Sequence, residues 1–354
     1  MLGANRICVW ESPVDVGYLD SKNDTNRAAA ELLRESFIGN LAPDLLLITS
    51  LFEGLDDACV TSVNKLGRAF PTICILYDLI PLIFRDNYLK NPRMELWYET
   101  KLDQLRRCDT ILAISDATRR DAIRHLGFRD SEVVNISGAV ERAFQVSPLN
   151  PMENTALSSS LGITKPFILY TGGIDFRKNI HRLIEAYSKL TKSLTSQHQL
   201  VIVCRISDME KDQLQSFATS NKLTADELIL TGYVNDDDLV YLYQQAKLFV
   251  FPSLYEGFGL PILEAMSCGT PTISSNCSSM PEILDYPEAT FDPHSVEDIA
   301  RCIKIALSDD TFRKNLQSHS LKQAAKFSWE KTAKLTLEQL ASHRNVNFIP
   351  NRPQ

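Results

Sequence analysis

The residues with the clearest chemical meaning lie in one short stretch, where a buried strand leads through a turn into a helix. Two carboxylates, Glu256 and Glu264, flank this turn with seven residues between them, and Gly257 and Gly259 lie within it. Glycines directly before a helix let the backbone approach a ligand and leave amide groups that attract anions. A diphosphate suits such amides, whereas the carboxylates would accept hydrogen bonds from hydroxyl groups. The stretch therefore predicts a site for a nucleotide sugar, which carries hydroxyls at both ends and phosphates in the middle.

An ordinary strand-to-helix turn with two solvated glutamates is the alternative to a binding site. Pro261 suits the first turn of the helix, and Gly269 suits its end. A pair of glycines alone would favour that alternative. Because both glutamates, both glycines and Pro261 occur in one strand-turn-helix context, we favour the binding site.

A second candidate segment joins two glycines to two adjacent cations. Gly172 and Gly173 follow a predicted strand, and Arg177 and Lys178 come shortly before a predicted helix. Arginine and lysine at a strand-end turn suit a diphosphate, because each charge-assisted hydrogen bond contributes roughly 1.5 to 3 kcal/mol. A turn whose cations face the solvent explains these residues equally well on their own.

Short apolar runs that are typical of buried strands recur along the chain, in its first half as well as before the candidate groups named above. In the first half each run ends in a polar or turn-forming pair, and the runs lie at 45–48, 72–76, 110–114 and 133–136. Near-continuous apolar strands that alternate with helices indicate parallel sheets covered on both faces. Ligands of such sheets bind at the carboxyl ends of the strands, which is where the candidate groups follow.

A segment rich in proline, asparagine and serine divides this pattern in two. It extends over 141–165 and is expected to be a linker. Beyond it a helix with one apolar face begins at Ile180, and further strands are expected at 167–170, 200–204, 228–230, 248–251 and 270–273. We therefore expect an α/β fold with two doubly wound parallel-sheet domains, 1–147 and 148–327, and a terminal helix and tail at 328–354.

The composition excludes several classes of protein. A net charge of −7 argues against a nucleic-acid binder. No apolar run approaches the roughly 18 residues that a membrane span needs. The eight cysteines and six histidines are scattered, which argues against a zinc site or a disulfide framework. We therefore expect a cytoplasmic protein that uses no metal and no cofactor.

One stretch, 85–129, runs against the acidic average because lysine and arginine are frequent in it, with carboxylates interspersed. A solvated, salt-bridged helical face would explain the stretch, and we favour this interpretation. The alternative is a patch that meets anionic lipid head groups at the inner surface of a membrane.

The stretch from Glu256 to Glu264 resembles the E-x7-E motif of retaining glycosyltransferases, in particular glycosyltransferase family 4. Further similar segments strengthen the resemblance, namely 253–259, 264–271 and the tryptophan-containing 327–330. The resemblance implies the GT-B architecture, in which two Rossmann-like domains face a cleft and the second holds most of the donor. It also implies that the terminal helix returns to pack on the first domain.

The resemblance also implies roles for individual residues. Glu256 would contact the donor sugar, and Glu264 would contact its ribose. Arg177 and Lys178 would bind the diphosphate and stabilise charge on the leaving nucleotide. Gly172 stands where many members carry an additional arginine, so Arg177 would serve in its place. Further residues would complete the donor site, namely Gly172, Gly173, Tyr233, Val234, Gly257, Phe258, Gly259 and Leu260.

The segment 232–234 resembles the one whose backbone contacts the nucleobase, although a plain strand-end turn explains it nearly as well. On the acceptor side, Tyr77 replaces the histidine that usually precedes the family's strand-end aspartate, and Asp78 would orient the loop rather than act as a base. Glu53 and Ser115 lie at equivalent strand ends and would line the acceptor side, but capping or turn roles explain them equally well. The opening strand and the glycine-rich acceptor loop of the family are not evident before Arg6, which indicates a shortened or divergent start.

Together these features predict a retaining hexosyltransferase that uses a nucleotide diphosphate sugar. We expect UDP-glucose as the donor, with GDP-mannose next, and a lipid-linked or saccharide acceptor in polysaccharide synthesis. A lipid-linked acceptor would bring the enzyme to the cytoplasmic face of the membrane. Cations and helix-end amides would stabilise the departing diphosphate, which would itself receive the acceptor proton. The alternatives are a GT-B nucleotide-sugar epimerase and a catalytically silent nucleotide-sugar-binding subunit.

Overall fold

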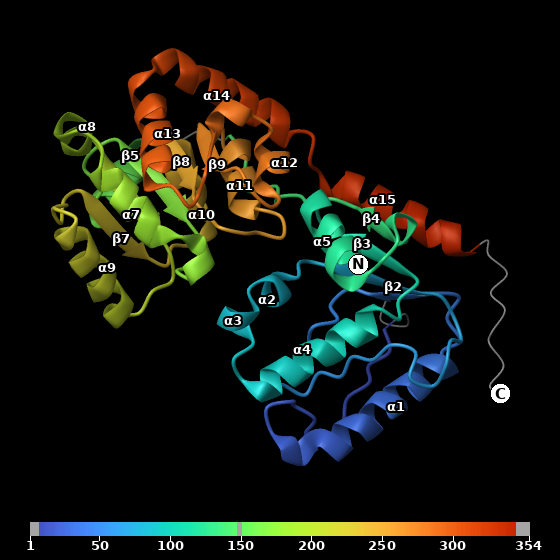
Figure 1. Ribbon diagram of the computed structural model, residues 1–354. Helices are drawn as coiled ribbons and strands as arrows, with labels where there is room; N and C mark the ends of the chain where they lie inside the picture. Colours follow the sequence, from blue (N-terminus) through green and yellow to red (C-terminus); the bar gives the residue numbers. More distant parts are fainter. Residues whose placement is uncertain (1–6, 147–150, 345–354) are drawn as a thin grey trace. The chain divides into compact units, whose positions relative to one another are not determined.

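The computed structural model describes residues 7–146 and 151–344, which form two compact units, each built around one parallel sheet (Figure 1). The chain passes from the first unit to the second after Ser137 and returns to the first at Lys331. The domain boundary expected after residue 147 lies outside the described residues. The expected fold class, an α/β protein with two parallel sheets, is confirmed.

As described, the first sheet contains four parallel strands in the order in which the sequence supplies them. They are β1 (Leu46–Ile48), β2 (Thr72–Leu76), β3 (Thr110–Ala113) and β4 (Val133–Asn135), close to the expected apolar runs. In register, Cys74 pairs with Ile111, and Ile111 pairs with Val133. Right-handed crossovers that advance in one direction put their helices on one face. This strand order therefore leaves the opposite face to be covered by another element.

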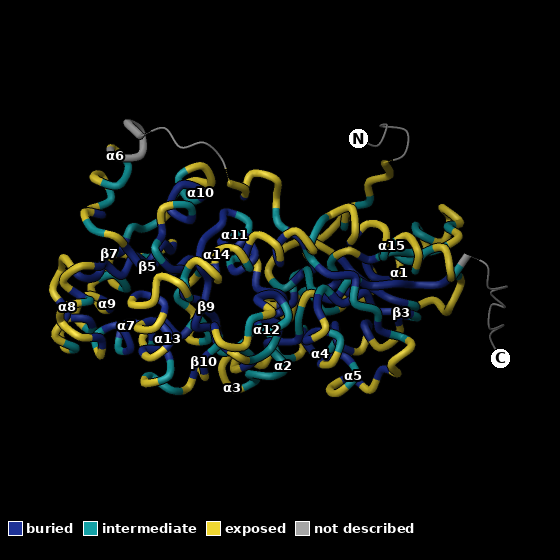
Figure 2. The backbone as a smooth tube through the Cα atoms, turned by 90° about the horizontal axis from the view of Figure 1, so that it is seen from above, coloured by how far each residue is buried: buried dark blue, intermediate teal, exposed yellow. Residues whose placement is uncertain are grey.

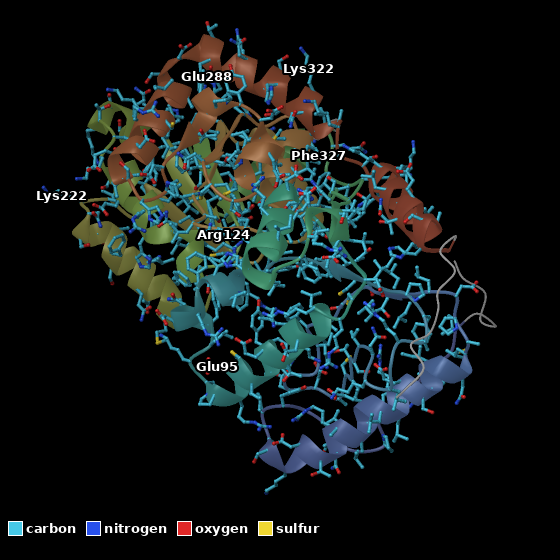
Figure 3. The ribbon with its side chains drawn as sticks, turned by 45° about the vertical axis from the view of Figure 1, so that its right-hand side comes forward. Glu95, Arg124, Lys222, Glu288, Lys322 and Phe327 are labelled. Atoms are coloured by element: carbon cyan, nitrogen blue, oxygen red, sulfur yellow. The ribbon has the colours of Figure 1, made fainter. Side chains whose placement is uncertain are left out.

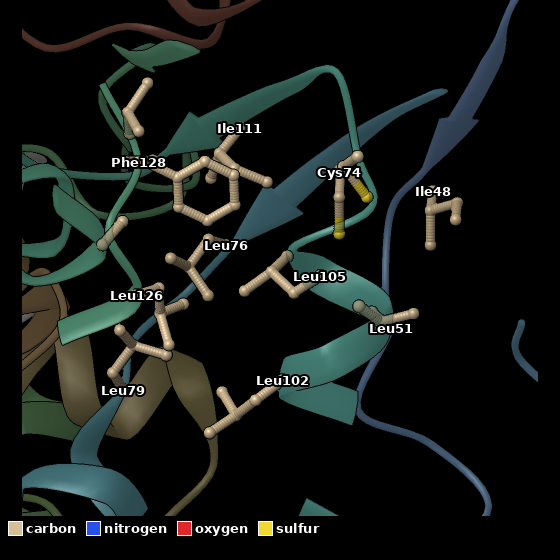
Figure 4. Close-up of a cluster of buried hydrophobic side chains, with 14 of the residues drawn as sticks. Ile48, Leu51, Cys74, Leu76, Leu79, Leu102, Leu105, Ile111, Leu126 and Phe128 are labelled. Carbon is tan, nitrogen blue, oxygen red and sulfur yellow. The ribbon is translucent and has the colours of Figure 1, made fainter. Parts of the chain in front are cut away.

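Helices α4 (Pro92–Leu105) and α5 (Asp116–Leu126) cover one face of the first sheet. Cys74 and Leu76 of β2 belong to the same buried cluster as Leu102 of α4 and Leu126 of α5 (Figure 4). Burying a leucine side chain of this kind contributes roughly 1.5 to 3 kcal/mol. The apolar runs of the sequence thus form the core on this side.

The C-terminal helix α15 (Trp329–Arg344) covers the opposite face of the first sheet. Ile73 and Leu112 alternate along their strands with the side chains of the first face. They pack against Leu335 and Leu340 of α15. The two-residue period of the strands therefore divides their side chains between two helical layers that lie far apart in the sequence.

Other helices of the first unit lie in its connections. They are η2 (Ser21–Asn23), α1 (Asp24–Asn40), α2 (Ile80–Ile83), α3 (Arg85–Tyr88) and η3 (Asp130–Glu132). Side-chain caps begin the two long helices beside the sheet: Asn91 accepts from the Arg93 amide at 2.8 Å, and Ser115 accepts from the Thr118 amide at 2.9 Å. Gly127 ends α5 in the left-handed conformation, with φ 77°.

The second sheet contains six described strands, all parallel, in the order β10-β9-β8-β5-β6-β7. Their bounds are β5 (Phe167–Thr171), β6 (Gln199–Val203), β7 (Leu228–Gly232), β8 (Leu248–Phe251), β9 (Thr272–Ser275) and β10 (Thr290–Phe291). This is the doubly wound order of Rossmann-like folds, in which the winding reverses once. The reversal lies between β5 and β8, which pair through Ile168 and Leu248.

Helices flank the second sheet, and the strands are buried between half-buried and exposed layers (Figure 2). Helix α7 buries Ile180, Leu183 and Tyr187, the face that its sequence pattern predicts. No described helix is both long enough and apolar enough to cross a membrane. The helices are η4 (Phe176–Lys178), α7 (Ile180–Ser188), α8 (Lys192–Gln197), α9 (Asp208–Ser220), α10 (Asp236–Gln245), α11 (Leu260–Ser267), α12 (Met280–Leu284), η5 (Pro287–Ala289), α13 (Val296–Ser308) and α14 (Asp310–Ala324).

The expected linker over 141–165 contains a helix, α6 (Pro151–Ser160), so the linker prediction is wrong for these residues. The serine triplet in this segment suggested a loop. The Ser158 hydroxyl instead lies 2.8 Å from the Tyr241 hydroxyl of α10 and hydrogen bonds with it. Tertiary contact therefore overrides the weak helix propensity of the segment.

Candidate functional site

The candidate groups of the second unit gather where the winding of its sheet reverses. Strand β5 leads into Gly172 and Gly173 and then into η4, whereas β8 leads into the turn before α11. The two strands are parallel neighbours, so both loops leave the sheet at the same edge. In open α/β sheets this edge is where ligands bind.

Glu256 lies between the two cations that the sequence assigned to a diphosphate. Its Oε2 is 2.6 Å from Arg177 Nη1, and its Oε1 is 2.7 Å from Lys178 Nζ. The Glu256 side chain is 10% exposed, and those of Arg177 and Lys178 are 19% and 13% exposed. Charges at this depth are screened much less than surface charges. The structure thus brings together the three residues expected to carry the chemistry, and Asp175 adds a more exposed carboxylate 3.8 Å from Arg177 Nε.

Hydrogen bonds to the backbone fix the two loops against each other. The Leu254 amide donates to the Arg177 carbonyl at 2.7 Å. The hydroxyls of Ser278 and Ser279, which follow β9, donate to the Glu256 carbonyl at 2.5 and 3.0 Å. The loops that carry Arg177, Lys178 and Glu256 are therefore held in place by hydrogen bonds to the backbone. The sequence reasoning had not singled out the two serines.

Asn179 joins the same loops and was also missed. It adopts the left-handed conformation with φ 61°. Its Nδ2 donates to the carbonyl of Pro252 at 3.0 Å and to that of Pro293 at 2.8 Å. Asparagine tolerates this conformation better than most residues. An asparagine between the cation pair and a helix was the signal available in the sequence.

The turn before α11 has the conformation that its glycines predict. Gly259 adopts φ 109° and begins the helix, and Pro261 lies in the first turn. Leu260 is exposed, whereas Phe258 is buried. The Phe258 ring packs against that of Phe327, which Figure 3 labels, with the ring centroids 6.0 Å apart. Phe258 thus contributes its side chain to packing, which leaves its backbone as the part that could meet a ligand.

Glu264 in α11 ends a chain of hydrogen-bonded hydroxyls. The Tyr243 hydroxyl of α10 lies 2.8 Å from Glu264 Oε2 and 2.6 Å from the Thr171 hydroxyl at the end of β5. Burial raises the pKa of Glu264, and the hydrogen bond from Tyr243 offsets only part of this rise. Burial also raises the pKa of Tyr243, which keeps its hydroxyl protonated and able to donate. A half-buried carboxylate is therefore fixed beside the end of β5.

Tyr170 supports the glycine pair after β5. Its hydroxyl donates to the Gly173 carbonyl at 2.8 Å, and a Cβ atom at Gly172 would come within 3.0 Å of the same hydroxyl. Gly172 also has φ 140°, a conformation that other residues rarely adopt. The arginine that the resemblance to glycosyltransferase family 4 implies at this position therefore does not suit this backbone.

Tyr233 and Val234 follow β7, which β6 separates from β5. The Tyr233 side chain is 74% exposed, and Val234 is half-buried. The parallel sheet brings them to the same edge as the other candidates. Their contact with a nucleobase stays a prediction.

The four acceptor-side candidates belong to the first unit. Asp78 and Ser115 accept hydrogen bonds at 2.9 Å from amides two and three residues further along, which are turn and capping contacts. Tyr77 follows β2 with its side chain 52% exposed. Glu53 accepts a hydrogen bond from the Ser50 hydroxyl. The capping alternative is thus present for Asp78 and Ser115, and the acceptor role stays a prediction for all four.

Carboxylates pair with several cations of the basic stretch 85–129. Arg85 lies 2.7 Å from Glu95 and 2.6 Å from Glu99, and Arg106 lies 2.8 Å from Asp103. These contacts support the interpretation as a salt-bridged face. Over residues 7–146 and 151–344, no group of three or more His, Cys, Asp or Glu side chains could hold a metal ion.

Comparison with known proteins gives the context of this site. Residues 154–323 match the family model described as "Glycosyl transferases group 1". The chain is 38% identical over 330 residues to the serotype-specific mannosyltransferase WbdA of Escherichia coli. The matched region covers 93% of this chain and 40% of that protein. It is 33% identical over 276 residues to the O-antigen chain mannosyltransferase B of Escherichia coli, covering 77% of this chain and 70% of that protein. The chain thus spans about two fifths of the length of WbdA.

Solved structures share the fold. Sucrose-phosphate synthase of Thermosynechococcus elongatus matches with a TM-score of 0.70 and 20% identity, covering 90% of this chain and 78% of that chain. At this identity the likeness concerns the fold alone. It agrees with the GT-B class that the two parallel sheets indicate.

Proposed function

The chain belongs to the glycosyl transferases group 1 family, and on that premise we propose that it transfers mannose from GDP-mannose to a saccharide or lipid-linked acceptor in polysaccharide synthesis. The observation that carries the proposal is the cluster of Arg177, Lys178 and Glu256 where the winding of the sheet reverses. The two relatives named above are mannosyltransferases, which favours mannose. The UDP-glucose preference of the sequence analysis has no support from them, so GDP-mannose, the second expectation, replaces it.

The donor would lie across the two strand-end loops of the second unit. Its diphosphate would contact Arg177, Lys178 and the amides of the turn before α11, because these positive groups follow the neighbouring strands β5 and β8 at that edge. Glu256 would then accept hydrogen bonds from hydroxyls of the sugar. Glu264 would accept them from the ribose, since carboxylate oxygens are acceptors only.

The cations would lower the barrier to departure of the nucleotide. Breaking the anomeric bond develops negative charge on the diphosphate and positive charge on the sugar. Arg177 and Lys178 lie in the loop after β5, where that charge develops, so they can stabilise it from the backbone positions that they already hold. No metal ion is required where two cations and the turn amides offset the diphosphate charge, and no other cofactor takes part.

The reaction would retain the anomeric configuration. The acceptor hydroxyl attacks the anomeric carbon from the side on which the diphosphate leaves. A bond forms from the acceptor oxygen to the sugar, the bond from the sugar to the phosphate oxygen breaks, and that phosphate oxygen takes the acceptor proton. A lipid-linked acceptor would place this reaction at the cytoplasmic face of a membrane.

A panel of nucleotide sugars tests the proposal. We expect the purified chain to release GDP from GDP-mannose, with release rising when an extract of lipid-linked acceptors is added and disappearing in Glu256→Ala. Release from UDP-glucose alone would overturn the choice of donor. Binding without release under every condition would indicate a silent binding subunit, and conversion of the sugar on its nucleotide would indicate an epimerase. The anomeric configuration of the product, read from one-bond carbon–proton couplings, tests retention.

A further inference from the structure

Three elements of the second unit meet in one buried hydrogen-bond chain. Thr171 ends β5, Tyr243 lies in α10 and Glu264 lies in α11. The Thr171 hydroxyl is 2.6 Å from the Tyr243 hydroxyl, which is 2.8 Å from Glu264 Oε2. Thr171 is 4% exposed and Tyr243 is fully buried, so water does not compete for these contacts.

The directions of the two hydrogen bonds follow from the chemistry of the groups. An ionised carboxylate only accepts, so the Tyr243 hydroxyl donates its proton to Glu264. The oxygen of Tyr243 is then free to accept, and the Thr171 hydroxyl donates to it. Among the described residues, Oε2 is the oxygen of Glu264 that accepts a hydrogen bond from the protein, which leaves Oε1 for a ligand hydroxyl.

Packing holds the Tyr243 ring so that its hydroxyl cannot swing away from Glu264. Phe144 and Phe249 contact the ring edge to face, with centroids 6.0 and 5.5 Å from it. The Thr270 hydroxyl donates to the Tyr243 carbonyl at 2.6 Å. The phenol is therefore a fixed donor rather than a mobile one.

We propose that Tyr243 is a positioning residue that fixes the Glu264 carboxylate so that its Oε1 accepts a hydrogen bond from a ribose hydroxyl of the bound nucleotide, with Thr171 completing the chain. This inference rests on the proposed function, because it assigns a specific task to the donor site. It adds two residues to that site, neither of which touches the nucleotide itself. It also makes the preference for ribonucleotides over deoxyribonucleotides depend on a buried phenol.

The test compares nucleotides that differ only in a ribose hydroxyl. Isothermal titration measures binding of GDP, UDP and their 2′-deoxy and 3′-deoxy forms to the wild type and to Tyr243→Phe. This substitution keeps the ring and removes the donor. We expect the variant to bind the preferred ribonucleotide about fivefold to tenfold more weakly, and to bind the deoxy form that lacks the contacted hydroxyl as the wild type does.

Tyr187→Phe is the matched control. Tyr187 is a fully buried tyrosine of the same unit, and its hydroxyl donates to the His198 carbonyl at 2.8 Å, away from Glu264. We expect this variant to keep the wild-type ratio of ribonucleotide to deoxyribonucleotide affinity. A general effect of losing one buried hydroxyl would instead change both variants alike.

A second variant, Thr171→Val, keeps the inference testable if Tyr243→Phe does not fold. It removes the hydroxyl that donates to Tyr243, and we expect a twofold to threefold loss of ribonucleotide affinity with the same dependence on the ribose hydroxyl. Equal losses for ribo and deoxy forms, or no loss at all, would overturn the positioning role while leaving the transferase intact. A wild type that binds neither GDP nor UDP would overturn the proposed function itself.

Discussion

Glu256 and Lys178 come from loops that follow two neighbouring strands, and their charged atoms lie 2.7 Å apart, with the second Glu256 oxygen 2.6 Å from Arg177. One carboxylate therefore holds two cations. A bound diphosphate would need the same two cations, so it would compete with Glu256 for them. Removing the negative charge of Glu256 by substitution therefore tests this competition directly.

Glu256→Gln keeps the shape of the side chain but removes the charge that the two cations share. We expect the free energy of unfolding to fall by about 3 kcal/mol, because the variant removes the carboxylate that lies 2.6 Å from Arg177 and 2.7 Å from Lys178, two cations with little exposure. Affinity for GDP should rise, since the carboxylate no longer competes with the diphosphate. Urea denaturation and isothermal titration measure the two effects, with Glu288→Gln on the surface as the control. Unchanged or weaker GDP binding would contradict the competition.

Lys178→Met tests the electrostatic part of the mechanism. We expect turnover of the donor to fall about 10²-fold, the usual effect of removing one fixed group that stabilises the transition state. Stability should change little, because Glu256 keeps its contact with Arg177. The matched control is Lys189→Met, which removes the same charge from an exposed position of the same unit. Equal turnover in the two variants would remove Lys178 from the mechanism.

Glu264 should make stability depend on pH in an unusual direction. Burial raises its pKa in the folded chain above the ordinary value of 4.5. At a pH between 4.5, which applies to the unfolded chain, and the raised pKa of the folded chain, the folded chain binds more protons than the unfolded chain. The contribution of Glu264 to stability is therefore lost as the pH rises through this range. Glu264→Gln removes the titration. The free energy of unfolding of the variant minus that of the wild type should therefore increase above pH 4.5 and then level off, and a difference that does not change with pH would contradict the assignment.

Leu335→Ala tests whether α15 stabilises the first sheet. Leu335 packs against the face formed by Ile73 and Leu112, so we expect its truncation to lower the free energy of unfolding by about 2 kcal/mol. Leu337→Ala is the control on the same helix, because Leu337 is 63% exposed. Its effect should stay below about 0.5 kcal/mol in the same urea denaturation. Similar losses in both variants would point to helix propensity rather than to packing.

The strands of the fold were predictable because buried parallel strands leave apolar runs that polar residues end. The runs expected at 72–76 and 248–251 coincide with β2 and β8. Strand β10 was missed because it has two residues and exists through its pairing with β9 rather than through a pattern of its own. Helix α6 was missed for a related reason, since its serines suggest a loop until the contact of Ser158 with Tyr241 is known.

The site was only partly predictable for the same physical reason. Glu256 and Lys178 were found because both follow strand ends, but the strand order that makes their loops neighbours could not be read from the sequence. Tyr243 and Asn179 were missed because their importance lies in their contacts. In the sequence Tyr243 is one apolar position of a helix, and its hydroxyl meets Glu264 only when α10 packs beside α11.

The two units become able to fold at different times during synthesis of the chain. The second unit is continuous from Gly138 to Glu330, so it can fold as soon as this segment has emerged. The strands of the first sheet are all made earlier, yet Ile73 and Leu112 stay uncovered until Leu335 and Leu340 have been synthesised. At about 5 to 20 residues per second, that interval lasts on the order of 10 to 40 s. During this time one apolar face of the nascent sheet is open to chaperones and to neighbouring chains, and the arrival of α15 ends that exposure.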